Sequence, residues 1–184
     1  TTLVINAIIE RKGARTGLIT SKGFRDVLEL GRELRYDAYD IFAEYPLPLV
    51  PRKLRREVDE RIASDGRVLV PIQAQDIKAV LNDLLAQKIE SVAVCLINSY
   101  ENPAHEEKIK ELIQDQAPDL SLSTSFEVLP QIREYERTCT TATNAYVKPI
   151  TSKYLQNLSA RLDRLGFGGK LYIMLSSGGI TSIE

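Results

Sequence analysis

The sequence has few of the residues that bind metals or form hydrolytic triads. It contains one histidine, His105, and two cysteines, Cys95 and Cys139. These cannot supply the ligands of a zinc site, and a Ser-His-Asp triad would have to use His105. We therefore expect no metal site. His105 lies beside Glu106 and Glu107 and is expected on the surface, whereas both cysteines lie in apolar stretches and are expected to be reduced core thiols of a cytoplasmic protein.

The sequence also lacks an excess of charge and long apolar runs. The 24 Lys and Arg residues nearly balance the 25 Asp and Glu residues, so the net charge is −1. A dedicated nucleic-acid binder would usually be clearly basic. No apolar run approaches the roughly 20 residues of a membrane span, and no signal-peptide pattern stands at the start. Neither nucleic acids nor membranes are therefore expected as partners.

What the sequence does contain is an alternation of apolar runs and helical periodicity. The continuous run at residues 91–97 (SVAVCLI) is typical of a central parallel strand that is buried on both faces. The alternation predicts an α/β fold with a mainly parallel sheet and helices on its faces, in one domain over residues 1–184. The expected strands are 14–20, 91–97, 120–128 and 171–175, and the expected helices are 3–10, 21–32, 76–88, one opened by Asn102 and Pro103, and a long tract from Pro130 to Gly166.

A segment at about residues 35–72 interrupts this alternation. Its first part, 35–51, is an arm rich in tyrosine and proline, which either serves or covers a site or packs on another part of a larger protein. The alternating residues 57–62, a Ser64-Asp65-Gly66 turn and the run 67–71 then predict a β-hairpin insertion. Four basic residues precede several acidic ones, which favours a solvated, salt-bridged face over a nucleic-acid site. They are Arg52, Lys53, Arg55 and Arg56.

One face of the long helical tract is predicted to pack on the sheet. Its apolar residues recur at intervals of three and four, the spacing of a core-facing stripe. They are Ile132, Tyr135, Cys139, Ala142 and Tyr146. Pro149 removes one backbone hydrogen bond and clashes with the carbonyl near Ala145, so we expect a kink or break between Asn144 and Thr151.

The opposite face carries Arg133 and Arg137 beside a block of threonines. Two like charges one turn apart lower the stability of a helix by a few tenths of a kcal/mol unless an anion or an acidic side chain neutralises them. Threonine forms helices poorly, and Thr138, Thr140, Thr141 and Thr143 together cost roughly 2 kcal/mol relative to alanine. Two explanations remain open. Either this face, extended by Asn144, lines a ligand site or a domain contact, or the threonine methyl groups pack on a sheet while their hydroxyls bond to preceding carbonyls.

The run Ser176-Ser177-Gly178-Gly179 follows the last expected strand directly. Glycines at such a place allow backbone amides to form an anion-binding nest, particularly if a helix starts next. An ordinary turn at the end of a strand explains the same residues equally well. The sequence has no complete Walker or dinucleotide fingerprint and no Gly-x-Ser-x-Gly elbow.

Several stretches, in order along almost the whole chain, resemble the N-terminal region of the hydantoinase A / 5-oxoprolinase family, which includes N-methylhydantoinase subunits and related acetone and acetophenone carboxylase subunits. They are NAIIERKGARTGLITSKGFRDVLELGR, PLPLVPRKLRREVDERIASDGRVLVP, VAVCLINSYENPAHE, EVLPQIREYERTCTTATNAYVKP and MLSSGG. The resemblance implies an enzyme that uses ATP to open a cyclic amide through phosphorylation of the lactam or imide oxygen. The alternative is a carboxylase subunit that activates a ketone with ATP. The implied architecture is that of actin-like ATPases, with ribonuclease H-like lobes.

The resemblance also implies what should accompany this chain. The family's Asp-Val-Gly-Gly-Thr phosphate-binding turn is expected just before Thr1 and a second lobe beyond Glu184, so the chain is expected to be an inactive fragment of a longer enzyme. ATP and Mg²⁺ are expected for the full-length enzyme, with no cofactor on this fragment. The expected partners are the rest of the polypeptide, a second, hydantoinase B-like subunit and a small cyclic amide substrate. Ile5 departs from the family's usual threonine and puts the neighbouring Asn6 site in doubt.

We predict that a substrate or phosphate group lies against the polar face of the long helix and the glycine turn. The candidate binding residues are Arg133, Tyr135, Arg137, Thr138, Asn144, Ser177, Gly178 and Gly179, with Thr2 and Asn6 as additions. In this hypothesis the arginines bind the anion and the backbone amides of the turn donate hydrogen bonds to it. No catalytic residue is assigned. The competing interpretation is a non-catalytic α/β assembly module whose polar helix face docks a neighbouring subunit.

Overall fold

The structure is a computed structural model that describes residues 2–32, 39–40, 42, 46–174 and 178–182. One domain over residues 1–184 stays a prediction; the structure divides the chain into two compact units, Thr1–Pro149 and Ile150–Glu184. The first unit contains the central sheet, and the second contains the end of the long helix and a small separate sheet.

A four-stranded parallel sheet forms the centre of the first unit. Its strands are β1 (Thr16–Ser21), β2 (Arg55–Val58), β5 (Ser91–Cys95) and β6 (Ser121–Thr124), in the spatial order β2-β1-β5-β6. In the parallel register, Leu18 of β1 lies between Arg55 of β2 and Ala93 of β5. Every residue of β1 and β5 is buried, as expected of central strands that are covered on both faces. The predicted mainly parallel α/β fold is confirmed.

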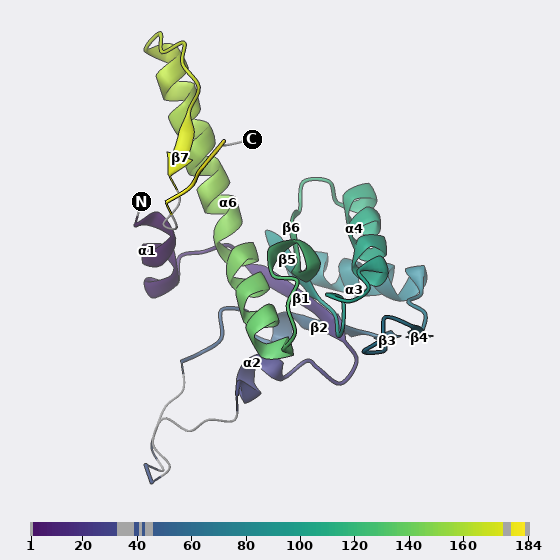
Figure 1. Cartoon of the computed structure of the whole chain (residues 1–184). Coiled ribbons are helices and arrows are strands. Elements are labelled where there is room, and N and C mark those ends of the chain that lie inside the picture. The colour runs from purple at the N-terminus through teal and green to yellow at the C-terminus, as the bar shows by residue number, and fades with distance from the viewer. Residues whose placement is uncertain (1, 33–38, 41, 43–45, 175–177, 183–184) are drawn as a thin grey trace. The chain divides into compact units, whose positions relative to one another are not determined.

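Helices cover both faces of this sheet. Helices α3 (Ala74–Ala86) and α4 (Ala104–Gln116) lie side by side on one face, and α6 (Glu134–Arg164) begins on the other (Figure 1). α3 buries Ile77, Leu81 and Leu84, and α4 buries Ile109 and Ile113, all within one hydrophobic core. The shorter elements are α1 (Leu3–Ile9), α2 (Val27–Leu30), the 3₁₀ helix η1 (Arg52–Leu54) and α5 (Ser125–Val128). Across the described ranges, no helix is both long and apolar enough to cross a membrane.

Two of the predicted elements are shorter in the structure. The helix expected at 21–32 is limited to α2, because residue 22 still bonds to the sheet, with Lys22 N donating to Val58 O at 3.0 Å. Leu30, expected to pack, is 62% exposed. The strand expected at 120–128 ends at Thr124 and gives way at once to α5.

The predicted hairpin forms, but only the last two residues of its first run take part. β3 (Arg61–Ile62) pairs antiparallel with β4 (Val68–Val70), whereas residues 55–58 join the parallel sheet as β2. The alternation at 57–62 is therefore shared by two strands of different sheets. In the preceding arm, residues 33–38, 41 and 43–45 lie outside the described residues, which leaves out Tyr36 and Tyr45. Both explanations of the arm stay predictions.

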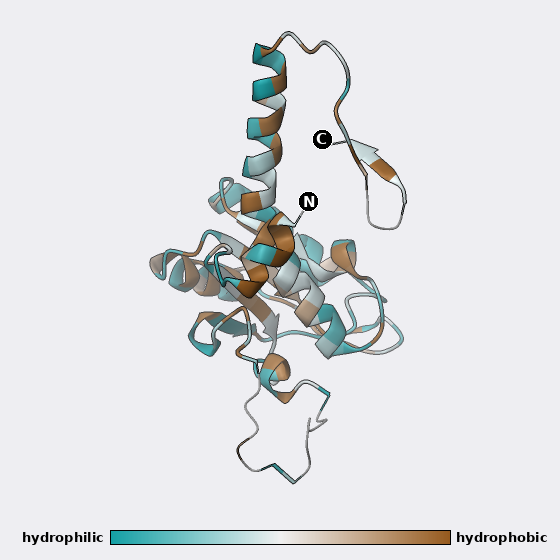
Figure 2. Cartoon of the chain, turned by 90° about the vertical axis from the view of Figure 1, so that its left-hand side faces the viewer, coloured by the Kyte–Doolittle hydropathy of each residue, from teal (hydrophilic) through white to brown (hydrophobic). Residues whose placement is uncertain are grey.

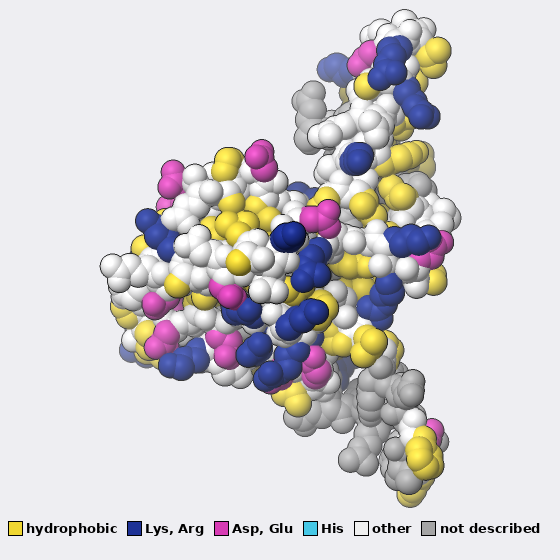
Figure 3. All heavy atoms as spheres, turned by 180° about the vertical axis from the view of Figure 1, so that it is seen from behind, with side chains coloured by type: hydrophobic (Ala, Val, Ile, Leu, Met, Phe, Trp, Pro, Cys, Tyr) yellow, Lys and Arg dark blue, Asp and Glu magenta, His cyan; other side chains and the backbone are white. Residues whose placement is uncertain are grey.

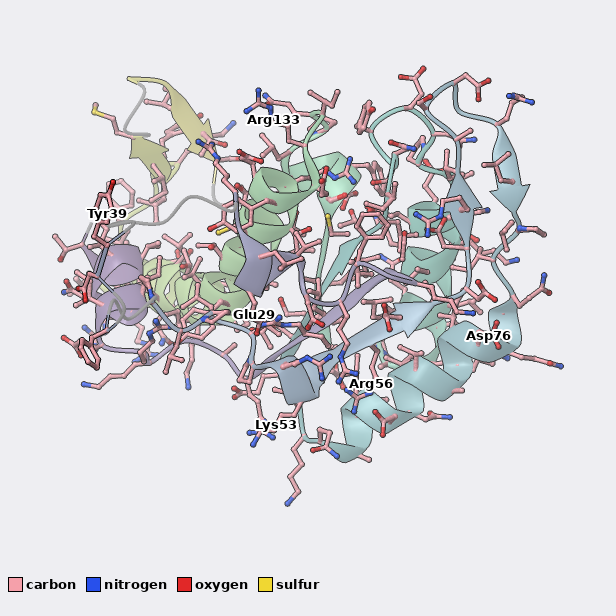
Figure 4. The ribbon with its side chains drawn as sticks, turned by 90° about the horizontal axis from the view of Figure 1, so that it is seen from below. Glu29, Tyr39, Lys53, Arg56, Asp76 and Arg133 are labelled. Atoms are coloured by element: carbon pink, nitrogen blue, oxygen red, sulfur yellow. The ribbon has the colours of Figure 1, made fainter. Side chains whose placement is uncertain are left out.

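Three of the four basic residues after the arm form ion pairs, and all but one of the four are exposed or half-buried. Arg52 Nε donates to Asp26 Oδ1 at 2.7 Å, and Arg56 pairs with Asp83. Lys53 points away from the protein (Figure 4), and on the face seen in Figure 3 basic side chains are interspersed with acidic ones. The exception is Arg55, which is fully buried, donates to Val50 O and pairs with Glu29. The prediction of a solvated side chain is wrong at Arg55.

Helix α6 begins later than predicted and turns a different face toward the sheet. It starts at Glu134 rather than Pro130, and Ile132 and Cys139 are exposed, so the predicted burial of both is wrong. The buried positions are Arg137, Thr138, Thr141, Ala142, Ala145, Tyr146 and Val147. Alanine and threonine predominate among them, because small side chains allow a helix to pack close to a sheet.

The predicted break at Pro149 is wrong, because α6 is helical from Glu134 to Arg164 with Pro149 inside it. Proline has no amide hydrogen to donate to the carbonyl four residues before it, here that of Ala145. The boundary between the two compact units nevertheless falls directly after Pro149. The kink stays a prediction.

The second unit contains a two-stranded antiparallel sheet of β7 (Tyr172–Met174) and β8 (Ile180–Ser182). The strand predicted at 171–175 therefore forms, but in a sheet of its own. None of the described residues from 150 to 182 is buried, and Leu165 and Met174 are 83% and 77% exposed.

Candidate functional site

The carboxyl ends of the parallel strands gather buried polar side chains. Ser21 ends β1, Cys95 ends β5, Ser125 follows β6 and Glu60 follows β2, while α4 and α6 contribute one charged side chain each. In open α/β sheets, ligands bind in the crevice outside the carboxyl ends of the strands. We call this set the carboxyl-edge cluster; it consists of Ser21, Glu60, Cys95, Glu106, Ser125 and Arg137.

Glu106 is the most enclosed carboxylate of the cluster. Its Oε1 accepts hydrogen bonds from Leu96 N at 2.8 Å and Ser125 Oγ at 2.6 Å, and its Oε2 accepts one from Phe126 N at 3.1 Å. Burial raises the pKa of Glu106, although these donors oppose the shift. Glu106 thereby joins the start of α4 to the ends of β5 and β6.

A second chain of contacts runs through Glu60. Ser21 Oγ donates to Glu60 Oε1, and Glu60 Oε2 lies 2.7 Å from His105 Nδ1. His105 is only 6% exposed, so the predicted surface position is wrong. The helix places His105 one turn before the fully buried Ile109, and the buried Glu60 satisfies its ring nitrogen. The helix itself begins at Ala104, whose N–H donates to Asn102 Oδ1 at 3.1 Å.

Arg137 lies inside the cluster and is 1% exposed. Its Nη2 donates to the carbonyl of Leu96, its Nη1 lies 3.5 Å from Gln131 O, and its guanidinium carbon lies 5.3 Å from the centre of the Tyr100 ring. Its Nε has no hydrogen-bond partner. Arg137 therefore contacts backbone carbonyls and an aromatic ring.

Arg133 does not share a helix face with Arg137. It precedes α6, has a left-handed φ of +85° and extends outward (Figure 4). With Tyr135 it lines an open pocket of about 360 Å³, together with Gly31, Arg32, Glu134 and Glu136. Arg32 Nε donates to Glu136 Oε1 at 2.5 Å in this pocket. The predicted like-charge pair on one face is therefore wrong, because the helix begins after Arg133.

The threonines and Asn144 make mostly structural contacts. Thr141 Oγ1 donates to Arg137 O at 2.7 Å and Thr143 Oγ1 to Cys139 O at 2.8 Å, the bonds to preceding carbonyls that one of the two explanations predicted. Thr138 Oγ1 lies 3.2 Å from Cys95 Sγ, and Asn144 Nδ2 donates to Ser123 Oγ at 2.9 Å. Burial raises the pKa of the Cys95 thiol, which disfavours a nucleophilic thiolate.

The remaining predicted residues lie apart from the cluster. Thr2 directly precedes α1, Asn6 lies on it, and both are exposed. The side of α1 seen in Figure 2 is mainly hydrophobic. After α1, Ala14 N donates to Tyr146 O of α6 at 2.9 Å. Ser177 lies outside the described residues. Gly178 has a left-handed φ of +89° and, with Gly179, leads into strand β8 rather than into a helix. The structure therefore does not bring all the candidate residues together, and their binding roles stay predictions.

The described residues do not offer a complete site for ATP and Mg²⁺. Within these residues, no group of three or more His, Cys, Asp or Glu side chains is placed to hold a metal ion. The glycine turn opens no helix in the described part, so it lacks the oriented amides of a helix N-terminus. In the carboxyl-edge cluster, most donors already bond to protein acceptors.

Glu60, Glu106, Ser21 and Ser125 were not among the predicted site residues. For Glu106 the sequence does contain a signal, because it precedes Ile109 and Ile113 by three and seven residues and so lies on the apolar face of α4. A carboxylate on such a face requires buried donors. The positions of Glu60 and Ser21 depend on the order of the strands, which no local pattern reveals.

Comparison with known proteins gives matches along almost the entire chain. Residues 1–117 match the hydantoinase/oxoprolinase N-terminal region, and residues 137–184 match the hydantoinase/oxoprolinase domain. The chain is 36% identical to the caprolactamase alpha subunit of Pseudomonas jessenii over 98% of its own length and 26% of that subunit. It is 32% identical to 5-oxoprolinase 1 of Arabidopsis thaliana over 98% of its own length and 16% of that protein.

Solved structures give the same result. The ATP-dependent caprolactamase from Pseudomonas jessenii superimposes on 98% of this chain with a TM-score of 0.92 and 35% sequence identity. Nucleotide-free acetone carboxylase superimposes on 100% of this chain with a TM-score of 0.84 and 27% sequence identity. This chain spans 26% and 28% of those two chains. The continuous match in sequence and fold leads to one conclusion. The chain belongs to the hydantoinase/oxoprolinase family, a family of ATP-dependent enzymes that includes carboxylases.

Proposed function

We propose that the protein to which this chain belongs is an ATP-dependent enzyme that opens cyclic amides. The observation that carries this proposal is the match to caprolactamase, which extends over 98% of the chain with a TM-score of 0.92. A shared fold alone is a weak guide to function. Sequence identity of 35% along the same residues supports a shared type of chemistry.

In this proposal the chain contributes one part of the catalytic cleft. The carboxyl-edge cluster organises the loops at the sheet edge, where α/β proteins bind ligands. The exposed Arg133 and the half-buried Tyr135 are candidates for binding an anionic group, since they share an open pocket with Arg32. Asn144, Ser177, Gly178 and Gly179, and Thr2 and Asn6 on α1, are further candidates for the complete enzyme.

In this proposal ATP and Mg²⁺ are bound by the whole protein and not by these residues alone. The described residues lack a metal-binding group and a helix N-terminus at the glycine turn. The rest of the polypeptide would supply the phosphate contacts, and ATP would supply the activation of the amide. A second, hydantoinase B-like subunit is the proposed partner, in line with the names of relatives that are themselves subunits.

A carboxylase subunit that activates a ketone is the second candidate. The observation in its favour is the superposition of nucleotide-free acetone carboxylase on 100% of the chain with a TM-score of 0.84. A non-catalytic assembly module is the third candidate. Its docking face would have to be a different one from that predicted, because Arg137, Thr138 and Thr141 are buried within the first unit.

The test is to assay the full-length protein, with its partner subunit, against cyclic amides and ketones. Caprolactam, 5-oxoproline and hydantoin would each be incubated with ATP and Mg²⁺, and acetone or acetophenone with ATP, Mg²⁺ and bicarbonate. Release of phosphate in step with ring-opened product, seen by mass spectrometry, supports the proposal. Carboxylated product from a ketone supports the second candidate. Absence of both ATP hydrolysis and product with every compound would leave the non-catalytic assembly module.

A further inference from the structure

The buried guanidinium of Arg137 has no acid beside it. Arg55, the other fully buried arginine among the described residues, pairs with Glu29. In the same described part of the chain, no carboxylate lies within ion-pair distance of Arg137, and its Nε bonds to nothing. A buried charge without an opposite charge beside it is costly. Stability alone therefore gives a poor account of an arginine at this position.

The contacts of this guanidinium are directed at one loop. Leu96 O and the Tyr100 ring both belong to the connection from β5 to α4, residues 96–103, which we call the β5 loop. The third contact, to Gln131 O at 3.5 Å, anchors the segment just before α6. Arg137 thus joins the start of α6 to the β5 loop at the carboxyl end of a central strand.

The β5 loop is bonded to several other elements at this edge. Ile97 N donates to Ser21 Oγ at 2.9 Å, Asn98 Nδ2 to Ile62 O at 2.8 Å and Asn102 Nδ2 to Gly66 O at 2.8 Å. Leu96 N donates to Glu106 Oε1. With Ser99 Oγ at 3.0 Å from Ser125 Oγ and Glu101 N donating to Asn98 O at 3.0 Å, these bonds hold the backbone of the loop but leave the ring of Tyr100 to other contacts. Tyr100, in the middle and half-buried, makes its described ring contact with Arg137.

We propose that Arg137 is a positioning residue for the reaction proposed above. It holds the start of the β5 loop and the Tyr100 ring in place at the ligand-binding edge of the sheet, and it does not itself contact the substrate or a phosphate. The proposal rests on the proposed function for its kinetic consequence, but its structural part does not. A cation over an aromatic ring is attracted more strongly when both are desolvated, which favours one position of the Tyr100 ring.

The variant that tests this is Arg137→Met, which keeps the length of the side chain and removes the charge and donors. The Leu96 carbonyl retains a second donor, Ser99 Oγ at 3.0 Å, and Glu106 keeps all its partners, so the fold is expected to survive. The matched control is Thr141→Val, one turn further along the same buried face. Its hydroxyl bonds only to the Arg137 carbonyl, within the helix.

A fluorescent reporter measures the position of the loop without any assay of activity. The sequence has no tryptophan, so Tyr100→Trp introduces a single one into this chain. In the Tyr100→Trp background we expect Arg137→Met to increase acrylamide quenching at least twofold, and Thr141→Val to leave it unchanged. Equal quenching in all three proteins would overturn the proposal.

Kinetics of the full-length enzyme, without the reporter, supply the second measurement. Misplacement of a loop by about 1 Å can cost up to a hundredfold in rate. We expect Arg137→Met to lower kcat at least tenfold with KM for the cyclic amide and for ATP changed less than threefold, and Arg137→Lys to recover part of the loss. A raised KM with unchanged kcat would instead indicate direct binding and refute positioning.

The two measurements also separate the possible failures. If Arg137→Met does not fold, Arg137→Lys decides, since wild-type kcat in that folded variant would contradict the need for a planar guanidinium. If the wild-type enzyme opens no cyclic amide, the proposed function fails, while the quenching result still tests the contact between Arg137 and the loop.

Discussion

At the residue scale, the chain uses buried polar side chains to join elements that its apolar core cannot orient. Glu106, Glu60 and Arg137 each contact groups far away in the sequence. A half-satisfied buried network is worse for stability than an apolar core, so these contacts make the carboxyl edge sensitive to single substitutions. Two residue-scale predictions follow from close packing and from protonation.

Gly13→Ala is expected to destabilise the first unit by about 1–3 kcal/mol, because a Cβ at residue 13 would meet the Tyr146 ring. The nearest ring atom, Cε1, would be 2.1 Å away. Thermal unfolding followed by circular dichroism should show a lower Tm. Gly168→Ala is the control, since its Cβ would meet nothing within 4 Å. An unchanged Tm for Gly13→Ala would show that Tyr146 moves aside freely.

Glu106 is expected to make stability depend on pH. Burial raises its pKa above the ordinary value of 4.5, so the folded chain keeps the proton to a higher pH than the unfolded chain does. Its contribution to stability is therefore full below 4.5 and is lost as the pH rises through the raised pKa. Urea unfolding between pH 4.5 and 7 should show this decline in the wild type and not in Glu106→Gln.

Glu106→Gln should also be less stable at every pH, because its amide group can accept only one of the two backbone N–H groups. The exposed Glu111→Gln on the same helix is the matched control and should follow the wild-type curve. If Glu106→Gln showed the same pH slope as the wild type, the decline would have to come from other groups.

At the scale of elements, α6 is the most informative. Its buried face consists mainly of small and hydroxyl-bearing residues together with one arginine. The helix looks polar in the sequence because these residues, rather than large apolar ones, pack against the sheet. The helix continues through Pro149, where the two compact units meet in sequence. A proline kept inside a helix costs up to about 3 kcal/mol relative to alanine.

Pro149→Ala is therefore expected to stabilise the helix, since alanine restores the amide that donates to Ala145 O and removes the ring clash. The gain is smaller than 3 kcal/mol, because proline also restricts the unfolded chain. The helical signal in circular dichroism at 222 nm should become slightly stronger, and the Tm should rise slightly. In the full-length enzyme, a fall in kcat with a higher Tm would indicate that a bend at this residue serves the reaction. A lower Tm would contradict the helical account.

At the scale of the whole molecule, the two units differ in how they are stabilised. The first has a buried core of strands β1 and β5 with three helices. The second has no buried residue in its described part and exposes Leu165, Tyr172 and Met174. A two-stranded hairpin without a hydrophobic core is marginally stable in water.

Limited trypsin digestion is expected to cut the second unit first. Lys153, Arg161, Arg164 and Lys170 should be cleaved well before sites between residues 60 and 149, because local unfolding costs less free energy where few apolar groups are buried. Mass spectrometry of the early fragments measures the order. Early cuts at Lys108 or Arg137 would show that the first unit is the less stable one. In the full-length protein, protection of these four sites would indicate that another part of the protein covers them.

The sequence by itself determined the α/β alternation, the central strand at 91–97, helix α3, the hairpin turn and the family, because each depends on local periodicity or on matching residues in order. The tertiary structure decided the rest. It placed His105 and Arg55 in the interior, split the run 57–62 between two sheets, and turned the polar face of α6 inward. These outcomes depend on which strands become neighbours, and a buried acid or carbonyl from a distant segment is what allows a histidine or an arginine to leave the surface.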